Sequence, residues 1–199
     1  MKVEEPDLSG SYTYSDYFTW QWDEMKELIR GKIYKMSPAP SSKHQITAGN
    51  LFGLLWNYLR GKSCQVFIAP FDVRLPLSWE EKTDKDITTV VQPDICVVCD
   101  PTKIDERGCL GAPDWIIEIL SSSTSSKDLN EKFDVYEEAG VKEYWVIHPQ
   151  EQTLLIYTLN ASGKYEGILK PYIRTDRVSP ITFPGLTLSL EEVFPEVDY

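Results

Sequence analysis

Hydrophobic residues recur along this chain at two spacings, which predict where helices and strands lie. Apolar positions three or four residues apart indicate a helix that begins at Ser41 or Ser42 and ends near Leu59. The same spacing covers residues 128–139, and Gly140 ends that helix. The other expected elements are a helix at 19–29, strands at 32–36, 64–75 with a bend at Pro70, 90–98, 115–120, 143–147, 153–159 and 165–173, and a helical turn at 190–194.

The order of these elements predicts the class of fold. The segment 115–120 is nearly all apolar, which is typical of a central strand covered on both faces. A helix at 128–139 and a strand at 143–147 follow it, and strand–helix–strand is the parallel crossover unit. The later strands can pair as an antiparallel hairpin. We therefore expect an α/β (α+β) fold with a mixed sheet, in one domain over 19–199 that follows an N-terminal arm at 1–18.

Composition and charge narrow the class of protein. Of 199 residues, 42% are hydrophobic and 26% are charged, which is normal for a chain that buries a core. The first ten residues lack the profile of a signal peptide, and no apolar run approaches the roughly 20 residues of a membrane span. We therefore expect a cytoplasmic protein without membrane contact. The net charge of −11 argues against a generic nucleic-acid coat but leaves a nuclease open, since metal ions offset carboxylates.

The four cysteines are too sparse for a disulfide scaffold, and without an export signal we expect them to be reduced. Cys96 and Cys99 form a CxxC motif, but they lie in a predicted strand, where residues three apart point to opposite faces. A zinc site would need two more ligands, and no second CxxC exists. Small core residues are the favoured interpretation.

The unusual residue of the chain is Glu118, which interrupts the apolar run at 115–120. A buried carboxylate without a partner costs several kcal/mol, so we expect Glu118 to be paired, protonated or bound to metal. Asp94 raises the same question at the head of the preceding strand, directly after Pro93. Two acids on neighbouring strands repel each other unless a cation lies between them. A hard divalent ion such as Mg²⁺ suits this arrangement.

A stripe on the helix that follows supplies the third candidate group. Asp128, Lys132 and Tyr136 are four residues apart and share one face. If that face packs on the strand of Glu118, the Lys132 ammonium comes near the metal, where it can orient a water and stabilise phosphoryl charge. The competing interpretation is a surface ion pair between Asp128 and Lys132. If the stripe is considered alone, this interpretation is favoured. Together with the two acids, the stripe favours a site.

Two further residues have plain structural interpretations. His44 lies on the apolar stripe of its helix, where a histidine is more often a satisfied core residue than a ligand. Glu27, on the predicted helix at 19–29, is most simply a solvent-exposed acid.

Several motifs between residues 91 and 149 resemble a known family of nucleases. A Pro-Asp pair followed by a glutamate on the next strand is similar to the PD-(D/E)XK nuclease superfamily. The longer string looks like the Uma-two type of restriction endonuclease, and the resemblance covers about residues 19–195. Its motifs are Val-Gln-Pro-Asp-Ile at 91–95, Ala-Pro-Asp-Trp-Ile-Ile-Glu-Ile-Leu-Ser at 112–121, Asp128 with Lys132 and Tyr136, Gly-Val-Lys-Glu-Tyr-Trp-Val at 140–146, and Glu27 near Gly31, Pro40 and His44.

The resemblance implies a restriction-endonuclease-like core in the order helix, strand, strand, strand, helix, strand. It implies that Asp94, Glu118 and the backbone carbonyl of Ile119 bind Mg²⁺, or Mn²⁺ in its place. It also brings Glu27 and His44 toward the same cleft.

One position departs from the superfamily pattern. The motif lysine should stand two residues after the glutamate, where this chain has Leu120. The resemblance therefore assigns the role of that lysine to Lys132, on the helix that follows. The assignment requires that Lys132 does not point to solvent.

Three functions remain open at this stage. The first is a Mg²⁺-dependent DNA endonuclease, expected as a homodimer because cutting both strands of a duplex commonly needs two sites. The second is a non-catalytic module that keeps the nuclease fold and binds nucleic acid or protein, which the acidic composition favours. The third is a metal-dependent hydrolase of small phosphodiesters. Fold resemblance alone does not choose among them.

Overall fold

The computed structural model describes residues 10–20, 26–35, 40–76, 83–121, 128–194 and 196. A seven-stranded sheet forms its centre, in the order β12-β11-β10-β9-β6-β3, with β13 also paired to β11. One pair, β9 with β10, is parallel and its neighbours are antiparallel, so the predicted mixed sheet is confirmed. The strands are β3 (Gln65–Ile68), β6 (Ile95–Val98), β9 (Trp115–Ile119), β10 (Glu143–His148), β11 (Thr153–Leu159), β12 (Tyr165–Gly167) and β13 (Tyr172–Ile173).

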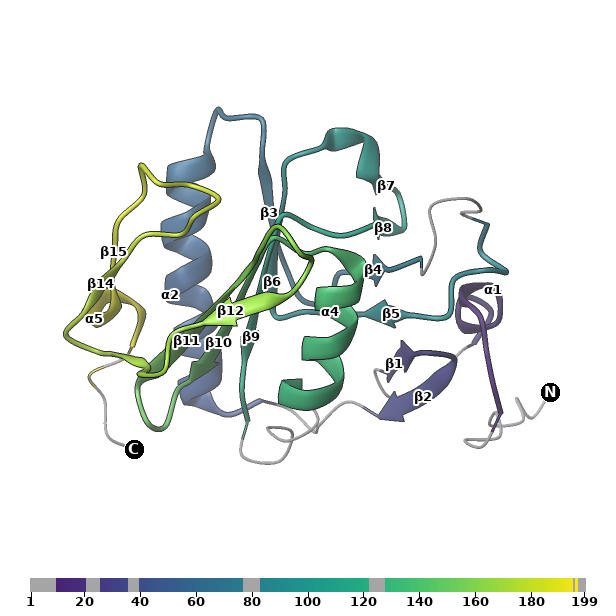
Figure 1. Ribbon diagram of the computed structural model, residues 1–199, viewed down its shortest axis with the longest axis horizontal. Helices are drawn as coiled ribbons and strands as arrows, with labels where there is room; N and C mark the ends of the chain where they lie inside the picture. The colour runs from purple at the N-terminus through teal and green to yellow at the C-terminus, as the bar shows by residue number, and fades with distance from the viewer. Residues whose placement is uncertain are drawn as a thin grey trace.

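Two helices cover opposite faces of this sheet (Figure 1). The helix α2 (Ser42–Leu59) packs Leu51 and Leu55 into the core on one face, and α4 (Phe133–Ala139) packs Tyr136 into the core on the other. Successive side chains of a strand alternate between the faces. Ile117 accordingly lies on the α2 side, and Glu118 lies on the α4 side. The order α2, β3, β6, β9, α4, β10 is the predicted core.

A second sheet lies beside the first and has the order β2-β1-β5-β4-β8-β7. Two of its strands come from predicted strands that are interrupted. The segment 64–75 bends at the cis peptide Ala69–Pro70, and the segment 90–98 bends at Pro93. Each therefore contributes one strand to each sheet. The strands of the second sheet are β1 (Lys26–Ile29), β2 (Lys32–Lys35), β4 (Val73–Arg74), β5 (Val90–Val91), β7 (Ile104–Asp105) and β8 (Gly108–Leu110).

The predicted helix at 19–29 is wrong. Lys26–Ile29 forms strand β1, which pairs with β2 around Arg30 and Gly31, while residues 21–25 lie outside the described part. Both turn residues have positive φ, of 49° and 77°, which is the two-residue turn that suits a hairpin. Pairing between strands outweighs the helical spacing of the apolar residues.

The first helix, α1 (Tyr14–Tyr17), lies within the predicted N-terminal arm. Its Tyr14 is fully buried against Leu28, Ile87 and Val90, beside the second sheet. The division into an arm and a domain at residue 19 stays a prediction.

The remaining described elements are short. A 3₁₀ turn, η1, covers Pro101–Lys103, and a five-residue π turn, η2, covers Asp128–Lys132 directly before α4. At the C-terminal end, β14 (Arg177–Val178) pairs with β15 (Leu188–Ser189), and α5 (Leu190–Val193) packs on α2. None of the helices in the described ranges is long and apolar enough to cross a membrane.

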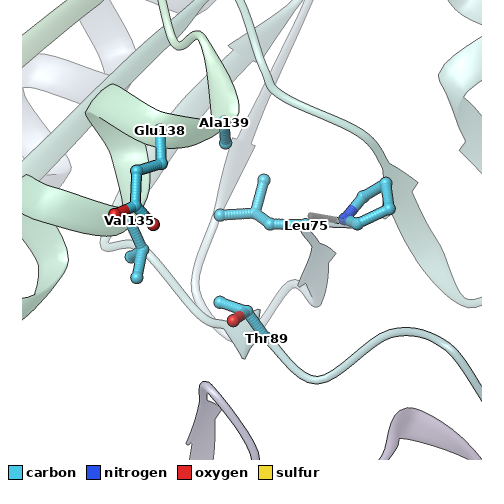
Figure 2. Close-up of a pocket in the computed structure, with 6 residues that line it drawn as sticks. Leu75, Thr89, Val135, Glu138 and Ala139 are labelled. Carbon is cyan, nitrogen blue, oxygen red and sulfur yellow. The ribbon is translucent and has the colours of Figure 1, made fainter. Parts of the chain in front are cut away.

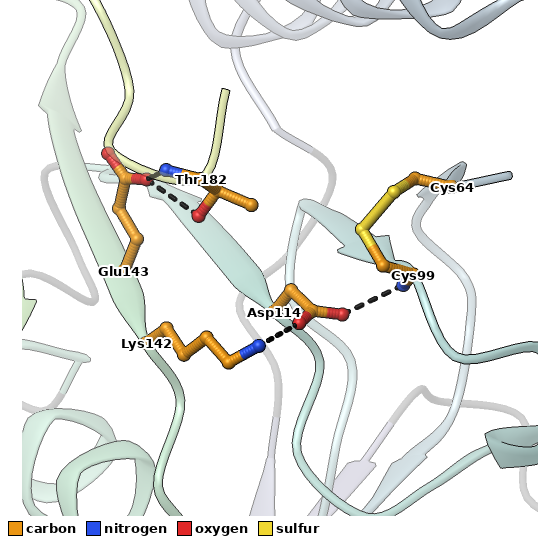
Figure 3. Close-up of a disulfide and its surroundings, with 6 residues drawn as sticks. All are labelled: Cys64, Cys99, Asp114, Lys142, Glu143 and Thr182. Carbon is orange, nitrogen blue, oxygen red and sulfur yellow. Dashed lines mark hydrogen bonds and ion pairs between the residues drawn. A yellow bond between two sulfur atoms is a disulfide. The ribbon is translucent and has the colours of Figure 1, made fainter. Parts of the chain in front are cut away.

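Cys64 and Cys99 form a disulfide, which corrects the expectation of reduced cysteines (Figure 3). They continue the antiparallel register of β3 and β6 by one step beyond the pair Gln65 and Val98. Sequence spacing could not show this, because the two strands are far apart along the chain. Cys96 and Cys99 do point to opposite faces, since Cys96 lies in the core beneath α4 and Cys99 packs against the core beneath α2.

Candidate functional site

The two predicted acids meet where β6 begins and β9 ends. Ile95 pairs with Ile117 in the antiparallel register, so the next step places Asp94 opposite Glu118. The Ile119 N–H donates to Asp94 Oδ2 at 2.7 Å. Because the N–H and C=O of one strand residue point to the same side, the Ile119 carbonyl is directed toward this region as well.

Lys132 reaches the same point from the last residue of the π turn. Its Nζ lies 3.0 Å from Glu118 Oε1 and 3.0 Å from Glu27 Oε1, and the residue is 3% exposed. The interpretation as a surface ion pair is therefore wrong for Lys132. Isolated π turns are rare in proteins, and those that occur are often found at functional sites. The side chain of Asp128 lies outside the described part of the structure, so its supporting role stays a prediction.

Tyr136 lies one helical turn beyond Lys132 and contacts the same carboxylate, that of Glu118. Its Oη donates to Glu118 Oε1 at 2.7 Å. Burial, followed by the negative charges of Glu118 and Glu27, raises the pKa of Tyr136 well above its usual value of 10. The phenol therefore keeps its proton and acts as a hydrogen-bond donor to the carboxylate.

Glu27 lies in the interior, at 3% exposure, and not in solvent as its plain interpretation expected. The correction follows from the strand β1, which carries Glu27 beneath the start of α4. In addition to Lys132, Glu27 Oε1 accepts the backbone N–H of Gln92 at 2.9 Å. Sequence reasoning gave Gln92 no role of its own, although it lies within the motif Val-Gln-Pro-Asp-Ile, two residues before Asp94.

His44 approaches Asp94 from the other face of the sheet. It stands in the first turn of α2, where Ser41 caps the helix by accepting the His44 backbone N–H. His44 Nε2 lies 3.2 Å from Asp94 Oδ1, with the imidazole 8% exposed and the carboxylate 22% exposed. Solvent reaches Asp94 more readily than it reaches His44, Glu27, Glu118 or Lys132.

The donor set suits a hard divalent cation. Among the described side chains, the carboxylates of Glu118 and Glu27 contact the Lys132 ammonium and that of Asp94 contacts the His44 imidazole, so carboxylates outnumber basic groups here. Within the described ranges, no group of three or more His, Cys, Asp and Glu side chains is arranged to hold a metal. The predicted ligand set needs only two side chains and a backbone carbonyl, and Mg²⁺ typically takes one or two carboxylates and keeps several waters.

A third buried glutamate, which sequence reasoning passed over, lies on the strand next to that of Glu118. Glu143 begins β10 and is fully buried. Its carboxylate accepts hydrogen bonds from Trp145 Nε1 and Ile181 N. It also accepts from the backbone N–H and the hydroxyl of Thr182, which Figure 3 shows. These four donors are neutral and come from fixed segments. Burial of a glutamate in an apolar run therefore does not identify a site by itself.

A pocket of about 270 Å³ lies between α4 and the second sheet. Figure 2 shows Leu75 and Thr89 on one side of it and Val135, Glu138 and Ala139 on the other. Glu138 also pairs with Arg30 at 2.7 Å, on the exposed rim. Among the residues that the structure describes, none of the predicted site residues lines this pocket.

The fold and the site define an α+β domain of the restriction-endonuclease type, with acids and a lysine gathered at one end of a mixed sheet. The model of the Uma2 family, described as "Putative restriction endonuclease", matches residues 14–191. This chain belongs to that family, as the motif string predicted.

Two similar proteins cover nearly the whole chain. An uncharacterized protein of Synechocystis sp. is 23% identical over 179 residues, which cover 87% of each protein. The crystal structure of a "putative nuclease belonging to DUF820" from Anabaena variabilis has a TM-score of 0.70 at 23% identity. The match covers 92% of this chain and 97% of the other. At this identity the structural likeness supports the fold.

Proposed function

We propose that this protein is a metal-dependent endonuclease that hydrolyses phosphodiester bonds in DNA. The observation that carries the proposal is the contact of Lys132 with two buried carboxylates, one of which stands beside Asp94 at the end of the sheet. Two buried acids around one lysine, with a third acid opposite one of them, are costly in a stable core unless the surplus charge has a use. Family membership supports a nucleic-acid substrate.

Each site residue has its own role in the proposed reaction. Asp94, Glu118 and the carbonyl of Ile119 would hold Mg²⁺, with Mn²⁺ as a substitute, and the bound ion would supply positive charge to the phosphoryl oxygens. Lys132 orients the attacking water and stabilises charge on the phosphoryl group. Around them, Tyr136 fixes the Glu118 carboxylate and His44 fixes the Asp94 carboxylate, while Glu27 holds Lys132 and Asp128 supports the turn.

The reaction is a displacement at phosphorus by water. The water oxygen forms a bond to phosphorus, and the bond from phosphorus to one sugar oxygen breaks. The water loses a proton, and the leaving oxygen takes one to become an alcohol. The proposed substrate is cytoplasmic DNA, and a homodimer would present two sites to a duplex.

Calorimetric titration of Mg²⁺ and Mn²⁺ tests the metal site first. We expect binding to the wild type and its loss in an Asp94→Ala, Glu118→Ala double variant, because both side-chain ligands are gone. The matched control is Glu143→Gln, which alters a buried glutamate at the other end of the sheet and should leave binding intact. Circular dichroism checks that each variant is folded.

Cleavage assays on duplex DNA, single-stranded DNA and RNA follow, with and without EDTA. We expect metal-dependent cleavage of DNA that Glu118→Ala abolishes and Glu143→Gln preserves. Undiminished cleavage by Glu118→Ala would contradict the site assignment. Analytical ultracentrifugation tests the homodimer separately.

A non-catalytic binding module is the second candidate, and the net charge of −11 favours it. It predicts binding of nucleic acid or protein that does not depend on a divalent ion. The same titration distinguishes the two, because wild type that binds neither ion and cleaves no substrate supports the module.

A further inference from the structure

A chain of hydrogen bonds connects the candidate site with the N-terminal helix α1. Gln92 stands at its centre, two residues before Asp94. Its backbone N–H donates to Glu27 Oε1 at 2.9 Å. Its side-chain Nε2 donates to Asp72 Oδ1 at 2.8 Å and to Tyr17 Oη, in α1, at 3.3 Å. Gln92 thus holds a site carboxylate with its backbone and is itself held by its side chain.

Asp72, at the far end of this series of hydrogen bonds, is held in place by the second sheet. The backbone carbonyl of Asp72 accepts the N–H of Cys109 at 2.8 Å. Gly108 approaches the same carbonyl so closely that an added Cβ would lie 2.1 Å from its oxygen. Tyr17 Oη additionally donates to the backbone carbonyl of Lys26, the residue before Glu27. Asp72 therefore offers Gln92 an acceptor whose position the surrounding backbone sets.

The near end is the ammonium of Lys132. Its Nζ lies 3.0 Å from Glu27 and 3.0 Å from Glu118, so both carboxylates determine where it stands. A displaced Glu27 would remove one of these two carboxylates from the surroundings of Lys132. Small errors in the placement of a reacting group cost large factors in rate.

We propose that Gln92 is a positioning residue, which together with Asp72 and Tyr17 sets Glu27 and through it Lys132. As far as it concerns cleavage, this inference rests on the proposed function. Through Tyr17, the helix α1 then contributes to the geometry of the site.

Replacement of the amide tests the first step. In Gln92→Leu the side chain keeps its approximate size and loses its donor. We expect kcat to fall at least about tenfold, with KM and the Mg²⁺ dissociation constant within about twofold of wild type, because Gln92 touches neither substrate nor ion. The matched control is Gln65→Leu, an exposed glutamine on β3, which should keep the wild-type kcat.

Replacement of the acceptor tests the second step. Asp72→Asn keeps an oxygen that can accept from Gln92, whereas Asp72→Ala removes it. We expect Asp72→Asn to keep most of the kcat that Asp72→Ala loses. Equal losses of kcat in the two variants would overturn the proposal, because the charge of Asp72 and not its hydrogen bond to Gln92 would then matter.

A readout independent of cleavage is the ¹⁵N NMR resonance of the Lys132 ammonium, assigned by its absence in Lys132→Arg. We expect this resonance to shift in Gln92→Leu and to stay in place in Gln65→Leu. An unmoved resonance overturns the proposal, whether kcat falls or not. If the wild type cleaves nothing, the proposed function fails, while the NMR comparison still decides whether Gln92 positions Lys132.

Discussion

The two ends of the central sheet bury similar groups in different ways. At one end, Glu118 contacts a lysine and a tyrosine, and the lysine is shared with a second carboxylate. At the other end, Glu143 accepts four neutral donors, and the Cys64–Cys99 disulfide joins neighbouring strands nearby (Figure 3). The first arrangement places charges of both signs in contact, and the second surrounds one carboxylate with neutral donors.

The difference teaches how a functional acid is distinguished from a structural one. Glu143 ties the segment around Thr182 to the sheet, and neutral donors suffice for that purpose. Glu118 has close, charged neighbours of both signs, which raise the cost of the folded state unless a ligand uses them. Chemical identity and burial are the same for both glutamates, so only the partners separate them.

The largest effect should come from removing the shared lysine. In Lys132→Met, Glu27 and Glu118 lose their common cation while they stay buried. We expect the free energy of unfolding at pH 7 to fall by about 3–5 kcal/mol, as for other broken buried pairs. Urea unfolding measures it.

The control for this loss is Lys142→Met at the other end of the sheet. Lys142 pairs with Asp114 at 2.6 Å, but its side chain is 67% exposed. We expect a cost of at most about 1 kcal/mol, as for surface ion pairs. Equal losses in the two variants would show that the Lys132 pair is no more buried in solution than the Lys142 pair.

An intermediate effect should separate the two glutamates directly. Glu143→Gln replaces two acceptor oxygens with one and turns an –NH₂ toward the donors of Thr182, so we expect a loss of about 2 kcal/mol. Glu118→Gln keeps an acceptor for Lys132 and Tyr136 and removes surplus charge, so we expect a change within about 1 kcal/mol. Thermal and urea unfolding of both variants provide the measurement. A greater loss in Glu118→Gln would invert the proposed distinction.

The finest difference is a change in how stability depends on pH, and it concerns Tyr136. Its pKa is raised in the folded state, so its contribution to stability is complete below about pH 10 and is lost as the pH rises above that value. Tyr136→Phe should cost about 2 kcal/mol at pH 7, through the lost hydrogen bond to a charged group. Between pH 10 and 11 the variant should lose stability less steeply than the wild type. Parallel curves would show that Tyr136 does not titrate as the structure implies.

The central features of the fold could be predicted because they depend on local pattern. The apolar run around Glu118 identified β9, and the four-residue spacing of Lys132 and Tyr136 identified the face that meets it. The strand β1 could not be predicted in this way, since it owes its conformation to pairing with β2 and β5. The burial of Glu27 follows from that pairing.

The partners of the site residues were harder to predict for the same reason. Gln92 and Asp72 each lie between a strand of one sheet and a strand of the other, and Tyr17 comes from α1. No spacing along the chain encodes their meeting. The resemblance to a family supplied Glu27 and His44 as neighbours, which residue patterns alone did not.

The disulfide closes a covalent ring in the chain, which the sequence alone did not predict. Cys64 and Cys99 are 35 residues apart, so the bond closes a ring that contains β3, β4, β5 and β6. Gln92 and Asp94 are members of this ring. A single backbone cut between residues 65 and 98 would therefore leave the protein in one covalent piece, and two fragments would separate only when a reducing agent is combined with a denaturant.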